Sequence, residues 1–544
     1  MLEESAATTL SPSPKDTEAA ISPERASEKD APVNDESQIP DVSGEPLGRV
    51  KTLLGARPDC FKSTLQEVLF VFMTIVATAS TSFLTGVSSI ITASVGRDLG
   101  MTQSEISWMN ASVNLTAGAF QLALGQLADL LGRKMMFLTG LSSFSLFAVI
   151  LGFAKNPFWM DIILGFMGIS SAMVVPPAIG ILGAAYAKPS KRKNLAFSAF
   201  SAGNPLGFVL GSIFCGIAAK LFDWRAAFWL IAILWAAFTA LGFYAIPNVE
   251  AFEHTEPLKV RLGGFLKQFD TVGAILTLFG TGLFTAAITL GPSDGWKSPH
   301  VIAMLVVGLV LLVVFFFWER TYAFPLMPPH IWRDRNFSFI LLTAILGFMS
   351  FTSAAFWLSY FMQQAQGLAP LTVAVHLIPQ CIAGLTWNII AGHILHKVNN
   401  TFIMAFGAVA YIVANLLLAL MKLHSSYWAF IFPSLIIQVV GADFQFNVAN
   451  SLAGGIFNTM IRLSSSVSMG ITTAVYSSVA NTPQGIANPM LKFTRAWDAS
   501  LALSAASVVG LPFIRLGTQG NSPPEESLEE SETTLRDSND EKRA

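Results

Sequence analysis

Charged residues are scarce in this chain. Asp, Glu, Lys and Arg make up 12% of the 544 residues, whereas hydrophobic residues make up 53%. Soluble domains carry about 25% charged residues, so the composition argues against a soluble protein and indicates a polytopic membrane protein. The net charge of -2 offers no basic surface to nucleic acid. The three cysteines (Cys60, Cys215 and Cys381) are too far apart to predict a disulfide framework, and no spacing of metal ligands or cofactor motif occurs.

Fourteen apolar stretches follow one another along the chain, each near the length of about 20 residues that a membrane-spanning helix needs. The predicted spans are 68–95, 105–127, 135–154, 157–186, 194–219, 224–246, 271–291, 301–319, 338–360, 371–395, 402–421, 427–448, 451–479 and 497–514. An even number of spans places both termini on one side. Lys and Arg are concentrated in the loops of that side, so the positive-inside bias predicts that both termini are cytoplasmic.

The junction between the twelfth and thirteenth spans is unusually short and, unlike the other junctions on its side, contains no Lys or Arg. A hairpin of two or three residues is tight, and a fused pair of helices would make the number of spans odd. A shortened isoform or an error in the gene model would also produce such a junction.

The polar gap between the second and third spans reads Gly125-Gln-Leu-Ala-Asp129-Leu-Leu-Gly132-Arg133-Lys134. It resembles the G-x-L-A-D-x-x-G-R-K signature between helices 2 and 3 of the major facilitator superfamily. The resemblance implies a conformational latch of Gly125, Asp129, Gly132, Arg133 and Lys134, which joins the two halves on the cytoplasmic side. Leu130 departs from the signature, which usually has a basic residue there. The alternative is a turn that serves only membrane insertion.

The resemblance also implies two six-helix halves. A weak repeat of the latch sequence, from Gly392 to Asn399, follows the second span of the last six. We therefore expect an all-α polytopic membrane protein with the major facilitator fold and 14 transmembrane helices (6+2+6). The predicted parts are a disordered cytoplasmic tail (1–60), an N-terminal half (61–250), two inserted helices with inner loops (251–335), a C-terminal half (336–515) and a second disordered cytoplasmic tail (516–544). Residues 57–61, 441–447 and 452–458 are similar to the fungal fourteen-helix drug:proton antiporter branch, and within it to aminotriazole-resistance-type transporters.

The fifth span carries Gly203, Asn204, Pro205, Gly207 and Gly211. The three glycines lie four residues apart, so they share one helix face and allow a second helix to approach closely in lipid. The proline permits a kink. The arrangement resembles the antiporter signature of helix 5, with Asn-Pro in place of Gly-Pro, and favours export. An ordinary packed helix pair is the alternative.

Amide side chains inside the apolar spans predict a polar central cavity. Their spacing places the members within a span on one helix face. The candidates for contact with a substrate are Asn110, Asn114, Gln121, Gln380, Gln438, Gln445 and Asn458. A cavity of this chemistry does not select one substrate.

Asp443 and Arg462 are charged residues inside apolar spans, where a charge is costly unless it is paired or hydrated. The long Arg462 side chain could bridge to Asp443. In one interpretation Asp443 is a proton carrier whose ionisation is tuned by Arg462. In the other the two residues form a fixed structural salt bridge. His376 is a further proton-coupling candidate. Related antiporters often carry an acid in helix 1 and an Arg in helix 4. This chain has no acid within 68–95, and it has Leu164 where the Arg of helix 4 would lie.

These features predict a secondary active transporter of the cell membrane, not an enzyme. It would be a monomer that exports a toxic or secondary-metabolite-like small molecule in exchange for protons, without a cofactor or metal. The first alternative is low-affinity transport of a small inorganic species such as ammonium or borate. The second is a transporter-like nutrient sensor, although the short tails leave little room for a folded signalling domain.

Overall fold

The computed structural model describes residues 57–58, 60–186, 191–247, 270–325, 327, 329–395, 397–480 and 482–517, which belong to one compact unit. These residues form helices and no strands. The helices are α2 (Thr64–Asp98), α3 (Gln103–Leu131), α4 (Arg133–Leu151), α5 (Pro157–Ala172), α6 (Val175–Ala185), α7 (Lys191–Leu221), α8 (Trp224–Ala245), α10 (Thr271–Asp294), α11 (Pro299–Thr321), α12 (Arg335–Gln364), α13 (Pro370–Ile394), α14 (Asn400–Ala419), α15 (Phe432–Ala480), α16 (Pro483–Ala487) and α17 (Pro489–Val509). Short helical turns are η1 (Pro329–Arg333), η2 (Tyr427–Ile431) and η3 (Leu511–Phe513). The predicted tails lie almost wholly outside the described residues, and the proposed domain boundaries remain predictions.

Twelve segments of the described chain are long and apolar enough to cross a membrane, with α5 and α6 together forming one of them. Two further crossings are more polar, namely α3 and the end of α15 (455–480). They lie antiparallel to each other, since Ser107 contacts Thr473 at one end (2.6 Å) and Gln121 accepts a hydrogen bond from Arg462 farther along (3.0 Å). Their low hydropathy follows from the buried polar side chains at their contact. The all-α polytopic fold with fourteen crossings is thus confirmed.

The chain reverses direction inside α15. A straight helix would separate residues 446 and 457 by about 16 Å along its axis, yet the rings of Phe446 and Phe457 lie 5.7 Å apart. The ring of Phe348 on α12 contacts both of them. The two arms, 432–449 and 455–480, therefore form a hairpin. This arrangement retains an even number of crossings, as the positive-inside analysis requires.

The bundle has two ends, which we name by their connecting glycines. At the Gly132 end, α3 turns into α4 through this single residue, whose φ of 110° favours glycine. At the Gly100 end, α2 turns into α3, and the side chains of Thr102 and Glu105 form a capping box that fixes the start of α3. The positive-inside analysis predicts that the Gly132 end is cytoplasmic.

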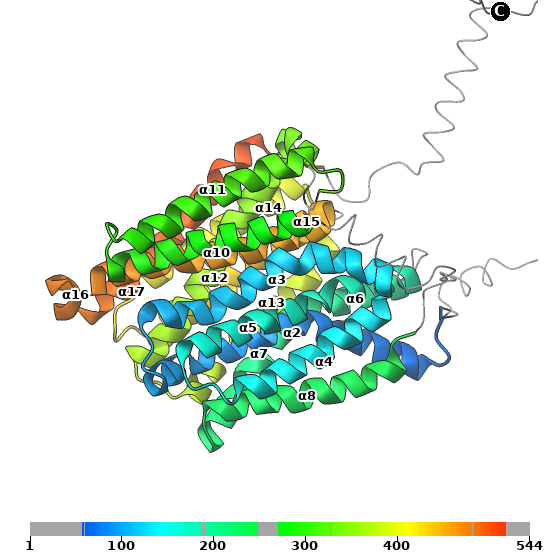
Figure 1. Cartoon of the computed structure of the whole chain (residues 1–544), viewed down its shortest axis with the longest axis horizontal. Coiled ribbons are helices and arrows are strands. Elements are labelled where there is room, and N and C mark those ends of the chain that lie inside the picture. Colours follow the sequence, from blue (N-terminus) through cyan, green and yellow to red (C-terminus); the bar gives the residue numbers. More distant parts are fainter. Residues whose placement is uncertain are drawn as a thin grey trace, which may run out of the picture. The chain divides into compact units, whose positions relative to one another are not determined.

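The inserted helices α10 and α11 lie at one edge of the bundle, with α11 outside α10, and α8 lies at the opposite edge (Figure 1). α10 contacts both α3 and the second arm of α15, since Ser104 donates to the Thr289 carbonyl and Gly470 packs against Thr285. α11 exposes apolar side chains such as Val310 and Phe317. The inserted pair therefore covers a seam between helices of the first six and the last six.

The first crossing begins earlier than the sequence predicts, because Ser63 caps the helix that starts at Thr64. Glu67 consequently lies within the helix and is buried, which corrects the expectation of no acid in helix 1. Its carboxylate binds Arg192 at 2.6 Å and accepts a hydrogen bond from the Tyr186 hydroxyl at 2.9 Å. Burial, together with this bond to Glu67, raises the pKa of Tyr186. The acid thus fastens α2 to the segments before and within α7.

Candidate functional site

Arg133 and Lys134 of the latch bind groups within the first six crossings. Arg133 binds Asp129 at 2.8 Å and donates to the carbonyl of Gly180 on α6 at 2.9 Å. Lys134 donates to the carbonyls of Phe243 and Ile246 at the end of α8. The basic pair therefore ties the start of α4 to its neighbours. Asp129 is exposed on 61% of its side chain, so it is accessible to a partner from the other half in another conformation.

The glycines of the fifth crossing face α2, as their spacing predicts. A Cβ atom on Gly207 would lie 2.6 Å from the carbonyl oxygen and 2.7 Å from the Cα of Ala79. Gly203 lies equally tightly against Thr78, and Gly211 against Phe83. On the same helix, Asn204 accepts a hydrogen bond from Ser82 of α2 at 2.9 Å. The two helices therefore pack backbone to backbone beside the cavity.

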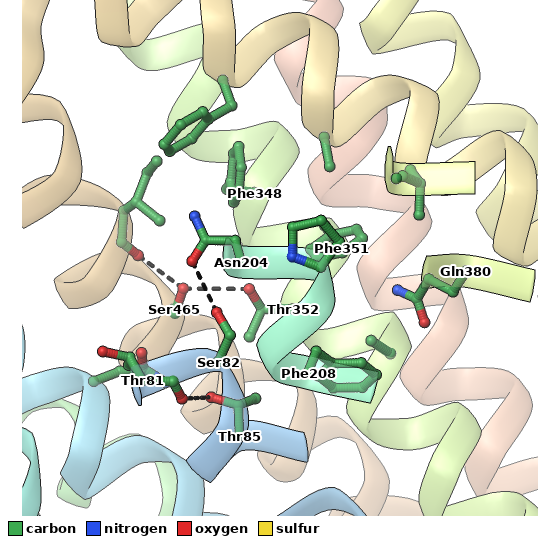
Figure 2. Close-up of a pocket in the computed structure, with 18 of the residues that line it drawn as sticks. Thr81, Ser82, Thr85, Asn204, Phe208, Phe348, Phe351, Thr352, Gln380 and Ser465 are labelled. Carbon is green, nitrogen blue, oxygen red and sulfur yellow. Dashed lines mark hydrogen bonds between the residues drawn. The ribbon is translucent and has the colours of Figure 1, made fainter. Parts of the chain in front are cut away.

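A central cavity of about 250 Å³ lies between α2, α3, α7, α12, α13 and both arms of α15. Hydroxyl groups line one part of it, including Thr81, Ser82 and Thr85 of α2 (Figure 2). An aromatic wall lines another part and consists of Phe208, Phe348, Phe351, Phe356 and Phe446. Ligand pockets in proteins commonly combine apolar walls with a few polar groups and enclose about 300–1,000 Å³. The cavity lies just below this range of volumes and has the same mixed lining, so it suits a molecule smaller than most drugs.

Four of the seven predicted amide residues line this cavity, namely Asn110, Asn114, Gln380 and Asn458. The other three do not, and the expectation is corrected for them. Gln121 is the acceptor for Arg462, and Gln445 points to α14, where it donates to the Met404 carbonyl. Gln438 is buried outside the cavity lining. A helix face of several polar residues is wider than the cavity, so some members pack against neighbouring helices instead.

The two intramembrane charges, Asp443 and Arg462, both line the cavity, but no ion pair joins them among the described residues. Oδ1 of Asp443 accepts a hydrogen bond from Asn388 at 3.0 Å, whereas its buried Oδ2 has no partner within the described part of the chain. The bridge considered from the sequence is therefore absent in this conformation. His376 lies outside the cavity lining, against the ring of Tyr427 at 4.5 Å.

Sequence reasoning missed Asn388, which orients the Asp443 carboxylate, and the contact between Thr352 and Ser465 (3.3 Å, Figure 2). The sequence could have indicated Asn388, because it is an amide residue in an apolar span, four residues after Gly384. The sequence did not indicate the aromatic wall, since phenylalanines are equally common on lipid-facing surfaces. In the described residues, no group of three or more His, Cys, Asp or Glu could hold a metal ion.

Comparison with known proteins agrees with this architecture. The Major Facilitator Superfamily model matches residues 70–487. The chain is 31% identical to the low affinity ammonium transporter of Saccharomyces cerevisiae, across 82% of this chain and 88% of that protein. It is 27% identical to the efflux pump terJ of Aspergillus terreus (78% and 83% covered) and to the aminotriazole resistance protein of Saccharomyces cerevisiae (78% and 79% covered).

Among solved structures, the tetrameric PepTSo2 crystal structure covers 83% of this chain and 97% of its own, with a TM-score of 0.59. At 16% identity this likeness shows the fold alone. The family match covers most of the fourteen crossings, and the curated relatives match along most of their own length. The chain is thus a multi-pass membrane transporter that belongs to the major facilitator superfamily, in its fungal drug-transporter branch.

Proposed function

We propose that this transporter exports a toxic or secondary-metabolite-like small molecule across the cell membrane in exchange for protons, as a monomer with both termini in the cytoplasm. Two relatives support the export direction through their names, an efflux pump and a resistance protein. The partial antiporter signature on α7 favours the same direction. The mixed lining of hydroxyls, amides and phenylalanines supports a small organic substrate with both polar and apolar parts.

The observation that carries proton exchange is the pair of unbridged charges in one cavity. With Asp443 ionised and Arg462 protonated, the two side chains together contribute no net charge. Proton binding to Asp443 leaves the guanidinium charge uncompensated. A unit charge at about 6 Å contributes about 3 kcal/mol at an effective dielectric constant of 20, or about a hundredfold in affinity. A basic substrate and a proton would therefore exclude each other from this cavity.

The position of Arg462 supports a link between this exchange and movement of the halves. Its hydrogen bond to Gln121 crosses from the second arm of α15 to α3. When α3 and this arm move relative to each other, Arg462 loses Gln121 and becomes available to Asp443. The partner of Arg462 would then differ between the two conformations, and with it the proton occupancy of Asp443.

The experiment is transport by the purified protein in liposomes, with and without an imposed pH gradient. Asp443→Asn should abolish accumulation driven by the gradient while exchange of substrate down its own gradient continues. Asp498→Asn is the matched control, because Asp498 pairs with Arg495 at an exposed position of α17. Gradient-driven transport that persists in Asp443→Asn would contradict the proposal.

A second candidate is low-affinity movement of ammonium, favoured by the 31% identical relative of that name. The same liposomes distinguish it. A current or pH change on addition of ammonium, abolished by Asp443→Asn, would favour this function. Displacement of a bound organic compound from the cavity, without such a change, would favour export.

A further inference from the structure

The Gln363 side chain joins the two halves at the Gly100 end of the cavity. Gln363 lies one residue before the end of α12, and its amide is buried against α2. Its Nε2 donates to the carbonyl of Ser89 at 2.7 Å, and its Oε1 accepts from the backbone N–H of Ala93 at 3.4 Å. One amide therefore binds both a donor and an acceptor of the same α2 turn.

Ser359, one turn earlier on α12, donates to the same Ser89 carbonyl at 2.7 Å. It also accepts from Nε2 of Gln363 at 3.2 Å, so the two side chains form one cluster. Ser359 and Ser89 are both buried. Because these bonds are shielded from water, removal of one side chain from the cluster costs a buried hydrogen bond between the two halves.

The cluster lies where the cavity ends, since Ser89 and Phe356 line the cavity while Ser359 and Gln363 follow on α12. α2 belongs to the first six crossings and α12 to the last six. In alternating access the two halves rock against each other around the site. A cavity that faces the Gly100 side requires α2 and α12 to part, which breaks the bonds of Gln363.

We propose that Gln363, assisted by Ser359, is the positioning residue that closes the Gly100 side of the cavity. It does so by binding the Ser89 carbonyl and the Ala93 N–H of α2. It sets how often the cavity faces that side. The inference assumes that the cavity is the transport pathway, but the test below measures access to the cavity and needs neither a substrate nor proton coupling.

Cys381 is a native reporter, because it is one of the residues that line the cavity. The test uses the full chain with Cys60→Ser and Cys215→Ala in sealed membrane vesicles of both orientations. A membrane-impermeant methanethiosulfonate is added outside, and the rate of Cys381 modification is measured. Gln363→Glu keeps the size of the side chain but replaces the amide N–H groups that bind Ser89 with a carboxyl group, which repels the Ser89 carbonyl when it is ionised. Gln364→Glu is the control, since the neighbouring Gln364 is exposed at the same helix end.

In Gln363→Glu, modification from the Gly100 side should rise roughly five- to tenfold, as expected for loss of a buried hydrogen bond, while modification from the Gly132 side falls. Ser359→Ala should change both modification rates in the same directions by a smaller amount. Because this variant keeps Gln363, it provides the test if Gln363→Glu does not accumulate. Equal rates from both sides in either variant, or a rise from both sides together, would overturn the proposal. Gln364→Glu should match the parent protein.

Discussion

Replacement of Gly207 tests the close packing of α2 and α7 most directly. A Cβ atom would lie 2.6 Å from the Ala79 carbonyl oxygen, whereas ordinary contacts of this kind begin at 3.4 Å. The helices would have to separate by roughly 0.8 Å to admit one methyl group. Overpacking of this kind costs about 1–3 kcal/mol, and the backbone of Ala79 has no rotamer that relieves it.

Gly207→Ala should therefore lower the unfolding temperature in detergent and reduce transport. Gly207→Leu adds three more carbon atoms between two backbones and should abolish transport. Gly183→Leu on α6 is the control, because a Cβ at Gly183 meets nothing within 4 Å. Both properties can be measured on purified protein, by thermal unfolding and by flux in liposomes. A Gly207→Leu protein with parental stability and flux would show that this face of α7 does not hold α2.

Three further predictions concern the latch, the topology and the first crossing. Asp129→Asn should slow transport without lowering the amount of protein in the membrane, because an exposed carboxylate stabilises one conformation more than the fold; unchanged flux would reduce residues 125–134 to an insertion turn. Tags at both termini should become accessible to protease only after permeabilisation, and opposite exposure of the two tags would contradict the hairpin in α15. Glu67→Gln should lower the free energy of unfolding by about 1–2 kcal/mol, since Arg192 loses its charged partner and only part of that loss is screened by solvent. Chemical unfolding, with Asp498→Asn as the control, would measure this, and equal stability of the two variants would show that the ion pair contributes little.

The reversal in α15 explains how a junction that looks too short in sequence joins two crossings. The first arm presents Gln445 and Phe446 near the turn, and the second arm returns with Phe457 against the same Phe348. Contacts between the aromatic rings stabilise the pair of arms directly beside the turn. A long polar loop is therefore not needed to keep both arms in the bundle.

The sequence by itself determined the crossings and the glycine face of α7. A bilayer requires about 20 apolar residues for each helix, so the apolar stretches indicate where the chain crosses, although α3 and the second arm of α15 are more polar than the other twelve crossings. A spacing of four places Gly203, Gly207 and Gly211 on one side of their helix. The sequence also predicted a turn in the polar gap from Gly125 to Lys134, but only the structure confines that turn to Gly132.

Only the tertiary structure decided which polar groups meet. Arg462 binds Gln121, which lies 341 residues away in the chain, rather than Asp443, and no local pattern encodes a choice between partners on different helices. Gln445 faces α14 instead of the cavity because the rotation of its arm is fixed by packing against Gly407 and Tyr411. Likewise, Glu67 became part of the first crossing because Arg192 and Tyr186, distant in sequence, supply the charge and hydrogen bond that allow a carboxylate to be buried there.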